Sequence, residues 1–131
     1  MVVDTSAIFA VIAREPDADR YRAALKGQAD LFMSAVTVFE CRTVVHRRLP
    51  PSLLGALEDF MRKGEVQIVP FDSDHATLAF AAYRRFGKGS GHKAQLNLGD
   101  CAAYALASSL DLPLLFKGND FGRTDVRAAL A

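Results

Sequence analysis

Short apolar runs separated by helix-like segments are the feature that most constrains the fold of this chain. Mostly apolar runs occupy positions 1–3, 31–33, 66–69 and 114–116. Strands that are short and apolar on both sides are typical of parallel sheets, because helices cover both faces of such sheets. The sequence therefore predicts an α/β fold with a short, mainly parallel central sheet between two helical layers.

Residues that favour helix starts and helix ends bound the segments between these runs. Ser34 and Asp72 suit the N-terminal cap of a helix, and Gly27 suits a helix end. The segment 101–110 is apolar on every side, which predicts a buried helix that Asp100 opens near the protein interior. The expected helices cover residues 8–13, 16–26, 35–48, 52–63, 74–86 and 101–110.

Length and composition exclude several classes of protein. The chain has 131 residues, which suits a single domain over 1–131, and its 50% apolar and 24% charged residues exclude a disordered chain. No unbroken apolar run is longer than that at 101–107, which is far shorter than the ~18 residues that a membrane span needs. No basic segment precedes Asp4, so no signal peptide is expected. We expect a cytoplasmic protein that does not enter a membrane.

Charge is unevenly distributed although the formal net charge is only +1. Residues 41–57 contain no acid and carry Arg42, Arg47 and Arg48, and residues 75–99 are also free of acid. Such blocks form either a basic face beside an acidic centre or ordinary solvated surfaces. The basic side chains that the second block contributes are Arg84, Arg85, Lys88 and Lys93.

Three acids stand where a parallel sheet gathers functional groups, and a fourth lies within a helix. Asp4 follows the first strand, Asp100 begins a helix, Asp120 follows the last strand, and Glu40 lies in an apolar stretch of a helix. Carboxylates that meet in a crevice repel one another unless a cation neutralises them. Oxygen ligands without His or Cys select Mg²⁺ or Mn²⁺, and Mg²⁺ held by carboxylates suits phosphoryl transfer.

Each acid also has a purely structural interpretation. Asp4 and Asp100 could cap helices, which is a frequent role of Asp at such positions. Asp120 could close a turn, and Glu40 could pair with Arg47 two turns further along the helix. Only the combination of the four positions favours a metal site.

Several motifs together resemble a known family. They are Met-Val-Val-Asp-Thr-Ser-Ala-Ile at 1–8, Glu40, Asn-Leu-Gly-Asp-Cys-Ala-Ala-Tyr-Ala-Leu-Ala at 97–107, and Pro-Leu-Leu-Phe-Lys-Gly-Asn-Asp-Phe at 113–121 with Thr-Asp at 124–125. In this order and spacing the whole chain resembles the PIN-domain family, and more narrowly the VapC toxins of type II toxin–antitoxin modules. The resemblance implies a PIN-like three-layer α/β/α sandwich.

The resemblance also implies roles for the acids. Asp4, Glu40, Asp100 and Asp120 match the family's acidic quartet around Mg²⁺, for which Mn²⁺ is a possible substitute. Asp4 and Asp100 are the expected direct ligands, and Glu40 and Asp120 would act through water or orient the nucleophile. The flanking side chains expected to support the ligands are Thr5, Ser6 and Asn119; many relatives carry an acid at the position of Asn119, so one metal ion is expected rather than two.

The implied function is that of a Mg²⁺-dependent endoribonuclease that leaves 5′-phosphate and 3′-hydroxyl ends. The resemblance further implies a homodimer and a VapB-type antitoxin whose C-terminal tail covers the cleft. The basic residues between 84 and 93 would then form a track for RNA phosphates beside the acidic centre.

The sequence is also compatible with two alternatives from other functional classes. A phospho-receiver-like signalling domain has a comparable length and a lysine after its last strand, as Lys117 is here, but the only Asp after a middle strand is Asp72. A catalytically silent PIN module that only binds RNA would keep the fold without turnover. Lys117 itself is expected to be a solvated turn residue.

Overall fold

A parallel four-stranded sheet forms the centre of the described part of the chain, residues 1–27 and 30–130 of the computed structural model. Its strands run in the order β3-β2-β1-β4, and every neighbouring pair is parallel. Val2 of β1 is in register with Phe32 of β2 and with Leu114 of β4. The predicted α/β fold with a parallel sheet is confirmed. The strands are β1 Val2–Val3, β2 Phe32–Ser34, β3 Gln67–Val69 and β4 Leu114–Leu115.

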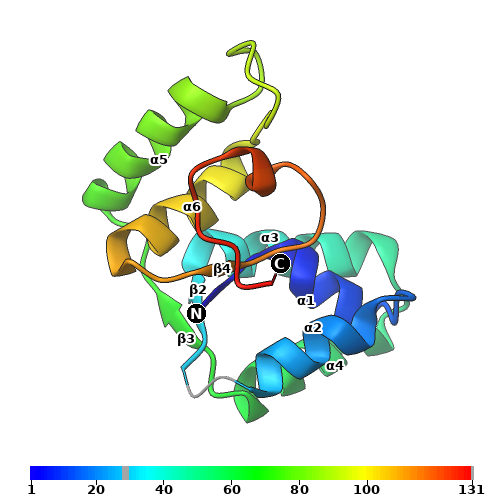
Figure 1. Ribbon diagram of the computed structural model, residues 1–131. Coiled ribbons are helices and arrows are strands. Elements are labelled where there is room, and N and C mark those ends of the chain that lie inside the picture. The colour runs from blue at the N-terminus through cyan, green and yellow to red at the C-terminus, as the bar shows by residue number, and fades with distance from the viewer. Residues whose placement is uncertain (28–29, 131) are drawn as a thin grey trace.

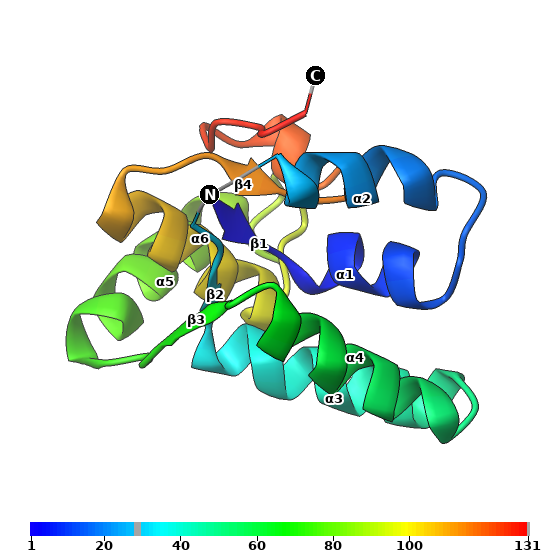
Figure 2. The ribbon, with the colours of Figure 1, turned by 90° about the horizontal axis from the view of Figure 1, so that it is seen from below.

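Helices cover both faces of this sheet. Figure 2 shows α5 and α6 on one side of the strands and α1 and α2 on the other, with α3 and α4 side by side below them. The helices are α1 Thr5–Ile12, α2 Ala18–Lys26, α3 Ala35–Arg48, α4 Ser52–Lys63, α5 Ser73–Phe86 and α6 Leu98–Leu110, and a 3₁₀ turn, η1, follows at Phe121–Arg123.

Successive residues of β1 and β4 contribute to two separate hydrophobic cores, one on each face of the sheet. Val3 and Leu115 pack with α1, α2, α3 and α4, whereas Val2 and Leu114 pack with α5 and α6. All four side chains are fully buried, because successive residues of a strand point to opposite faces of the sheet. Because both faces of the sheet are buried, apolar and polar residues do not alternate along these two strands.

Two predicted helix starts differ from the structure by three residues each. Helix α1 begins at Thr5 instead of residue 8, since Asp4 caps it directly after β1. Helix α6 begins at Leu98 and is capped by Asn97, so Asp100 is its third residue and not its opening residue. No helix in the described ranges is long and apolar enough to cross a membrane.

Strands β1 and β4 are neighbours in the sheet (Figure 1). Because they are parallel, their carboxyl ends lie at the same end of the sheet. The backbone N–H of Asp4 donates to the carbonyl of Leu115 at 2.9 Å, which ties the start of α1 to the end of β4. The first turns of α1 and the residues after β4 therefore meet at one edge of the sheet.

Candidate functional site

Asp4 is a buried acid with one oxygen unsatisfied. It caps α1, and its Oδ2 accepts hydrogen bonds from the N–H of Ser6 at 3.0 Å and from the Ser6 hydroxyl at 2.6 Å. Its Oδ1 is buried and has no hydrogen-bond partner among the described residues. Burial raises the pKa of Asp4 to about 6, and the neighbouring Glu40 adds to the rise. The capping role therefore accounts for one carboxylate oxygen and leaves the other available.

The Ser6 hydroxyl joins Asp4 to the end of β4. It donates to Asp4 and accepts from the backbone N–H of Lys117 at 2.9 Å. The Lys117 ammonium contacts Glu15 and lies 2.8 Å from Asp17 Oδ1. The expectation of a solvated turn lysine is wrong, because Lys117 forms ion pairs with the segment between α1 and α2.

Glu40 reaches the same edge from α3. The Thr5 hydroxyl donates to Glu40 Oε1 at 2.6 Å, so the partner of Glu40 in the structure is Thr5 and not Arg47. The other side of its carboxylate lies against Gly99, in the first turn of α6. The two adjacent hydroxyls thus divide the work: Ser6 supports Asp4, and Thr5 supports Glu40.

Asp100 enters the site from α6. Its Oδ2 accepts from the Asn97 N–H at 3.0 Å while its own N–H donates to Asn97 Oδ1 at 2.8 Å, which is a reciprocal capping box. Partial burial, together with smaller contributions from the charges of Asp4, Glu40 and Asp120, raises the pKa of Asp100 to about 7. Because every one of these acids acts on Asp100, the four predicted acids belong to one electrostatic cluster.

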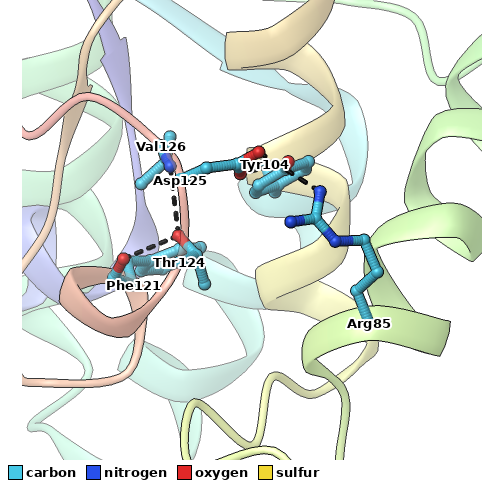
Figure 3. Close-up of polar contacts among 6 residues, drawn as sticks. All are labelled: Arg85, Tyr104, Phe121, Thr124, Asp125 and Val126. Atoms are coloured by element: carbon cyan, nitrogen blue, oxygen red, sulfur yellow. Dashed lines mark hydrogen bonds and ion pairs between the residues drawn. The ribbon is translucent and has the colours of Figure 1, made fainter.

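Asp120 and Asn119 lie at the exposed start of η1. Downstream contacts hold this turn: Thr124 donates to the carbonyl of Phe121 at 2.7 Å, and Asp125 accepts from the Tyr104 hydroxyl at 2.5 Å. Asp125 also lies 3.3 Å from the Arg85 guanidinium, so one carboxylate ties the C-terminal segment to both α5 and α6 (Figure 3).

A cavity of about 300 Å³ collects most of these groups. It unites three of the predicted acids with both hydroxyls, whereas Asp120 lies outside its lining. Glu15 and Arg48 also line it; no sequence pattern pointed to Glu15, and Arg48 was one of three arginines in an acid-free block. The full lining is Asp4, Thr5, Ser6, Phe9, Glu15, Glu40, Val44, Arg48, Asp100 and Lys117.

The donor set of this cavity fits a hard divalent cation. In residues 1–27 and 30–130, no three His, Cys, Asp or Glu side chains converge closely enough to hold a metal ion by themselves. Mg²⁺ does not need such a cage, since it commonly binds through one or two carboxylates and keeps several waters. The unsatisfied Oδ1 of Asp4 and the raised pKa values of Asp4 and Asp100 mark charges that a cation would stabilise.

The predicted basic residues lie outside this cavity. Arg85 is engaged with Asp125 and stacks 4.5 Å from the centre of the Phe86 ring. Arg84 and Lys88 line a separate cavity of about 320 Å³ at the end of α5, and the carbonyl of Lys93 accepts from Arg123 at 3.0 Å.

Comparison with known proteins gives a consistent result. The PIN domain family matches residues 1–127. Ribonuclease VapC28 of Mycobacterium tuberculosis is 45% identical over 99% of this chain and 98% of its own length. Among solved structures, the sarcin–ricin loop cleaving toxin VapC20 of M. tuberculosis superposes with a TM-score of 0.79 at 16% identity, covering 95% of both chains. VapBC2 of Rickettsia felis, solved with a promoter DNA fragment, superposes with a TM-score of 0.72 at 13% identity, covering 97% of this chain and 94% of that one.

Proposed function

The chain belongs to the PIN-domain family and within it to the VapC ribonucleases, and from this premise we propose that it is a Mg²⁺-dependent endoribonuclease, the toxin of a type II toxin–antitoxin pair acting in the cytoplasm. The observation that carries the proposal is the cavity in which Asp4, Glu40 and Asp100 meet. The raised pKa values of Asp4 and Asp100 support it, because burial and, to a smaller extent, the neighbouring carboxylates disfavour the charged form of both groups, and a bound cation would relieve that penalty.

Asp4 and Asp100 would hold a single Mg²⁺, with Mn²⁺ as a substitute. When bound, the cation supplies Lewis-acid stabilisation of charge on the scissile phosphate and lowers the pKa of water. Asn119 supports one ion rather than two, since its amide brings no charge to the mouth of the site.

The protein's own groups orient the nucleophile. The Thr5 hydroxyl holds the carboxylate of Glu40 in place. Glu40 and Asp120 together direct a water molecule toward the phosphorus. The water oxygen bonds to phosphorus and its proton passes to a carboxylate of the quartet. The bond from phosphorus to the 3′-oxygen breaks, and the leaving 3′-oxygen takes up a proton from solvent. The products are a 5′-phosphate and a 3′-hydroxyl.

Features of the structure disfavour the receiver-like alternative. Asp72 is committed to the cap of α5, where its Oδ1 accepts from the His75 N–H at 3.0 Å. Lys117 is paired with Glu15 and Asp17. Neither group is available for the phosphoacceptor and lysine roles that a receiver requires.

The direct test uses the purified chain and RNA. We expect cleavage with Mg²⁺ and none with EDTA, and Asp4→Asn and Asp100→Asn should each abolish cleavage while the protein stays folded, because Asn retains capping ability. Cleavage that persists in EDTA would contradict the metal assignment. RNA binding without any cleavage would instead identify a silent RNA-binding module.

A VapB-type antitoxin is the proposed inhibitor. The VapBC2 structure of R. felis supports this pairing by analogy, since its toxin has the same fold. Co-expression with a cognate VapB-type antitoxin should suppress RNA cleavage, and suppression should be lost when the C-terminal tail of the antitoxin is deleted.

A second copy of the chain is the proposed partner at an apolar surface on α3, α5 and α6. Phe39, Phe80 and Leu98 are 72%, 64% and 77% exposed, and Phe80 and Leu98 border an apolar groove of about 500 Å³. Phe80→Glu should convert a dimer into a monomer in size-exclusion chromatography with light scattering. Leu110→Glu, at the opposite end of α6, is the control and should leave the dimer intact.

A further inference from the structure

Arg48 places a positive charge in the wall of the acidic cavity. It is the last residue of α3 and lines the cavity together with Asp4, Glu40 and Asp100. Its guanidinium carbon lies 4.6 Å from the centre of the Phe9 ring, and Phe9 lines the same cavity. The sequence did not distinguish Arg48 from the other arginines of its acid-free block.

Other cations near the site are already neutralised. Lys117, the second basic residue of the lining, pairs with Glu15 and Asp17. Arg42, on the same helix as Arg48, forms a two-point contact with Glu58 at 2.6 and 3.0 Å. Arg48 has no ion pair with any residue of the described ranges, so its guanidinium N–H groups stay available for an anion.

The contact with Phe9 orients this free cation. A guanidinium stacked on an aromatic face keeps its N–H groups in the plane of the group, free to bond at the edge. The planar fork matches two oxygens of a phosphate, which a lysine cannot do. Arg48 is therefore preorganised for a phosphate at the rim of the cavity.

The substrate needs such a charge at this place. The carboxylates of the cavity repel RNA phosphates, and salt screens charges that lie more than about 10 Å apart at 0.1 M ionic strength. The basic residues at the end of α5 line a different cavity, whereas Arg48 shares the wall with the acids.

We propose that Arg48 is a positioning residue that binds a backbone phosphate of single-stranded RNA next to the scissile phosphate. This inference rests on the proposed ribonuclease function. Arg48 holds the strand across the cavity while the acids act on the neighbouring phosphodiester, so its loss affects substrate binding more than the chemical step.

The test compares Arg48→Ala with Arg48→Lys and with the control Arg47→Ala. Arg47 is the preceding residue, is also exposed, and does not line the cavity. KM and kcat are measured on a short fluorescent RNA at several salt concentrations. We expect Arg48→Ala to raise KM about tenfold with a smaller change in kcat. The slope of log kcat/KM against log salt should become shallower by about 0.7, which is one phosphate contact to a single strand.

Arg48→Lys should restore the salt slope but only part of the KM, since it keeps the charge and loses the planar fork. Arg47→Ala should match wild type. If Arg48→Ala matches Arg47→Ala while wild type cleaves RNA, the assignment of Arg48 is wrong and the proposed function stands. If wild type cleaves no RNA, the proposed function fails, and salt-dependent binding of the same RNA then judges Arg48 alone. A variant that binds RNA normally and is weakened only toward an antitoxin would overturn the RNA assignment.

Discussion

Gly99 is the residue that allows the Glu40 carboxylate to lie against the first turn of α6. A Cβ added at Gly99 would stand 2.6 Å from Glu40 Cδ, which is too close for any real side chain. Gly99 and Glu40 are far apart in the sequence, and their contact brings Glu40 of α3 close to Asp100 of α6. The requirement for glycine here is therefore steric and belongs to the site rather than to the helix.

Gly99→Ala should displace Glu40 without unfolding the protein. Because misplacement of a catalytic group by about 1 Å costs on the order of 100-fold in rate, we expect kcat to fall by about that factor. Gly55→Ala is the matched control, since Gly55 lies in α4 with nothing near its Cβ position. Equal activity of the two variants would show that Glu40 has room to move without consequence.

Ser6→Ala tests the hydroxyl that joins Asp4 to β4. The change removes one of the hydrogen bonds that keep the Asp4 pKa from rising further, and it releases the Lys117 N–H. Loss of a group that orients a metal ligand typically costs 10- to 100-fold in metal affinity, so we expect Mg²⁺ to bind about tenfold more weakly. A Mg²⁺ titration followed by thermal shift measures this, with the exposed Ser109→Ala as control. An unchanged Mg²⁺ affinity would argue that Asp4 is not a ligand.

The fold was predictable because its determinants are local. Apolar runs define strands such as Val2–Val3, and caps and glycines such as Ser34 and Gly64 bound helices within a few residues. The predicted start of α6 is wrong by three residues although the sequence contains the information, since Asn97 with Asp100 three residues later is a capping-box pattern.

The site was predictable only in part, because several of its contacts are long-range. Strand ends indicated Asp4 and Asp100, but nothing local indicates that Glu15 lines the same cavity. Arg48 differs from Arg42 only through the position of Glu58 on another helix. Which charged side chains of the site are paired therefore depends on tertiary packing, and the local sequence pattern does not reveal it.

The raised pKa values of Asp4 and Asp100 predict a pH-dependent stability of the metal-free protein. Both lie above the ordinary value of 3.8, at about 6 and about 7. Between about pH 4 and pH 7, Asp4 and Asp100 keep their protons in the folded state and lose them in the unfolded state. The free energy of unfolding should therefore fall as pH rises through that range. Urea denaturation in EDTA across this range measures the slope.

Asp100→Asn should reduce this slope and raise the melting temperature without metal, whereas Asp74→Asn, at an exposed acid of α5, should not. Mg²⁺ should stabilise wild type by about 2.7 kcal/mol at a hundredfold excess over Kd, and Asp100→Asn should lose most of that gain. A wild type without a Mg²⁺ shift, together with an Asp100→Asn variant that melts lower in EDTA, would make these acids structural.

Asp125 should control the activity through the position of Asp120. Its carboxylate accepts from Tyr104 on α6 and pairs with Arg85 on α5, and the turn that carries Asp120 is its near neighbour in the chain (Figure 3). Asp125→Asn weakens both contacts, so the turn becomes free to move and we expect kcat to fall about tenfold. Tyr104→Phe, which removes one contact, should have a smaller effect in the same direction.

The control for Asp125 is Arg62→Ala, which breaks an exposed ion pair with Asp59 on the surface of α4. Such pairs contribute less than about 1 kcal/mol, so this variant should keep full activity and nearly full stability. Steady-state kinetics and thermal melting of the three variants distinguish a role of Asp125 in positioning Asp120 from a role in stabilising the fold. If Asp125→Asn loses stability in proportion to activity, and Tyr104→Phe loses neither, Asp125 serves the fold; a fall in kcat at unchanged melting temperature identifies it as the residue that positions Asp120.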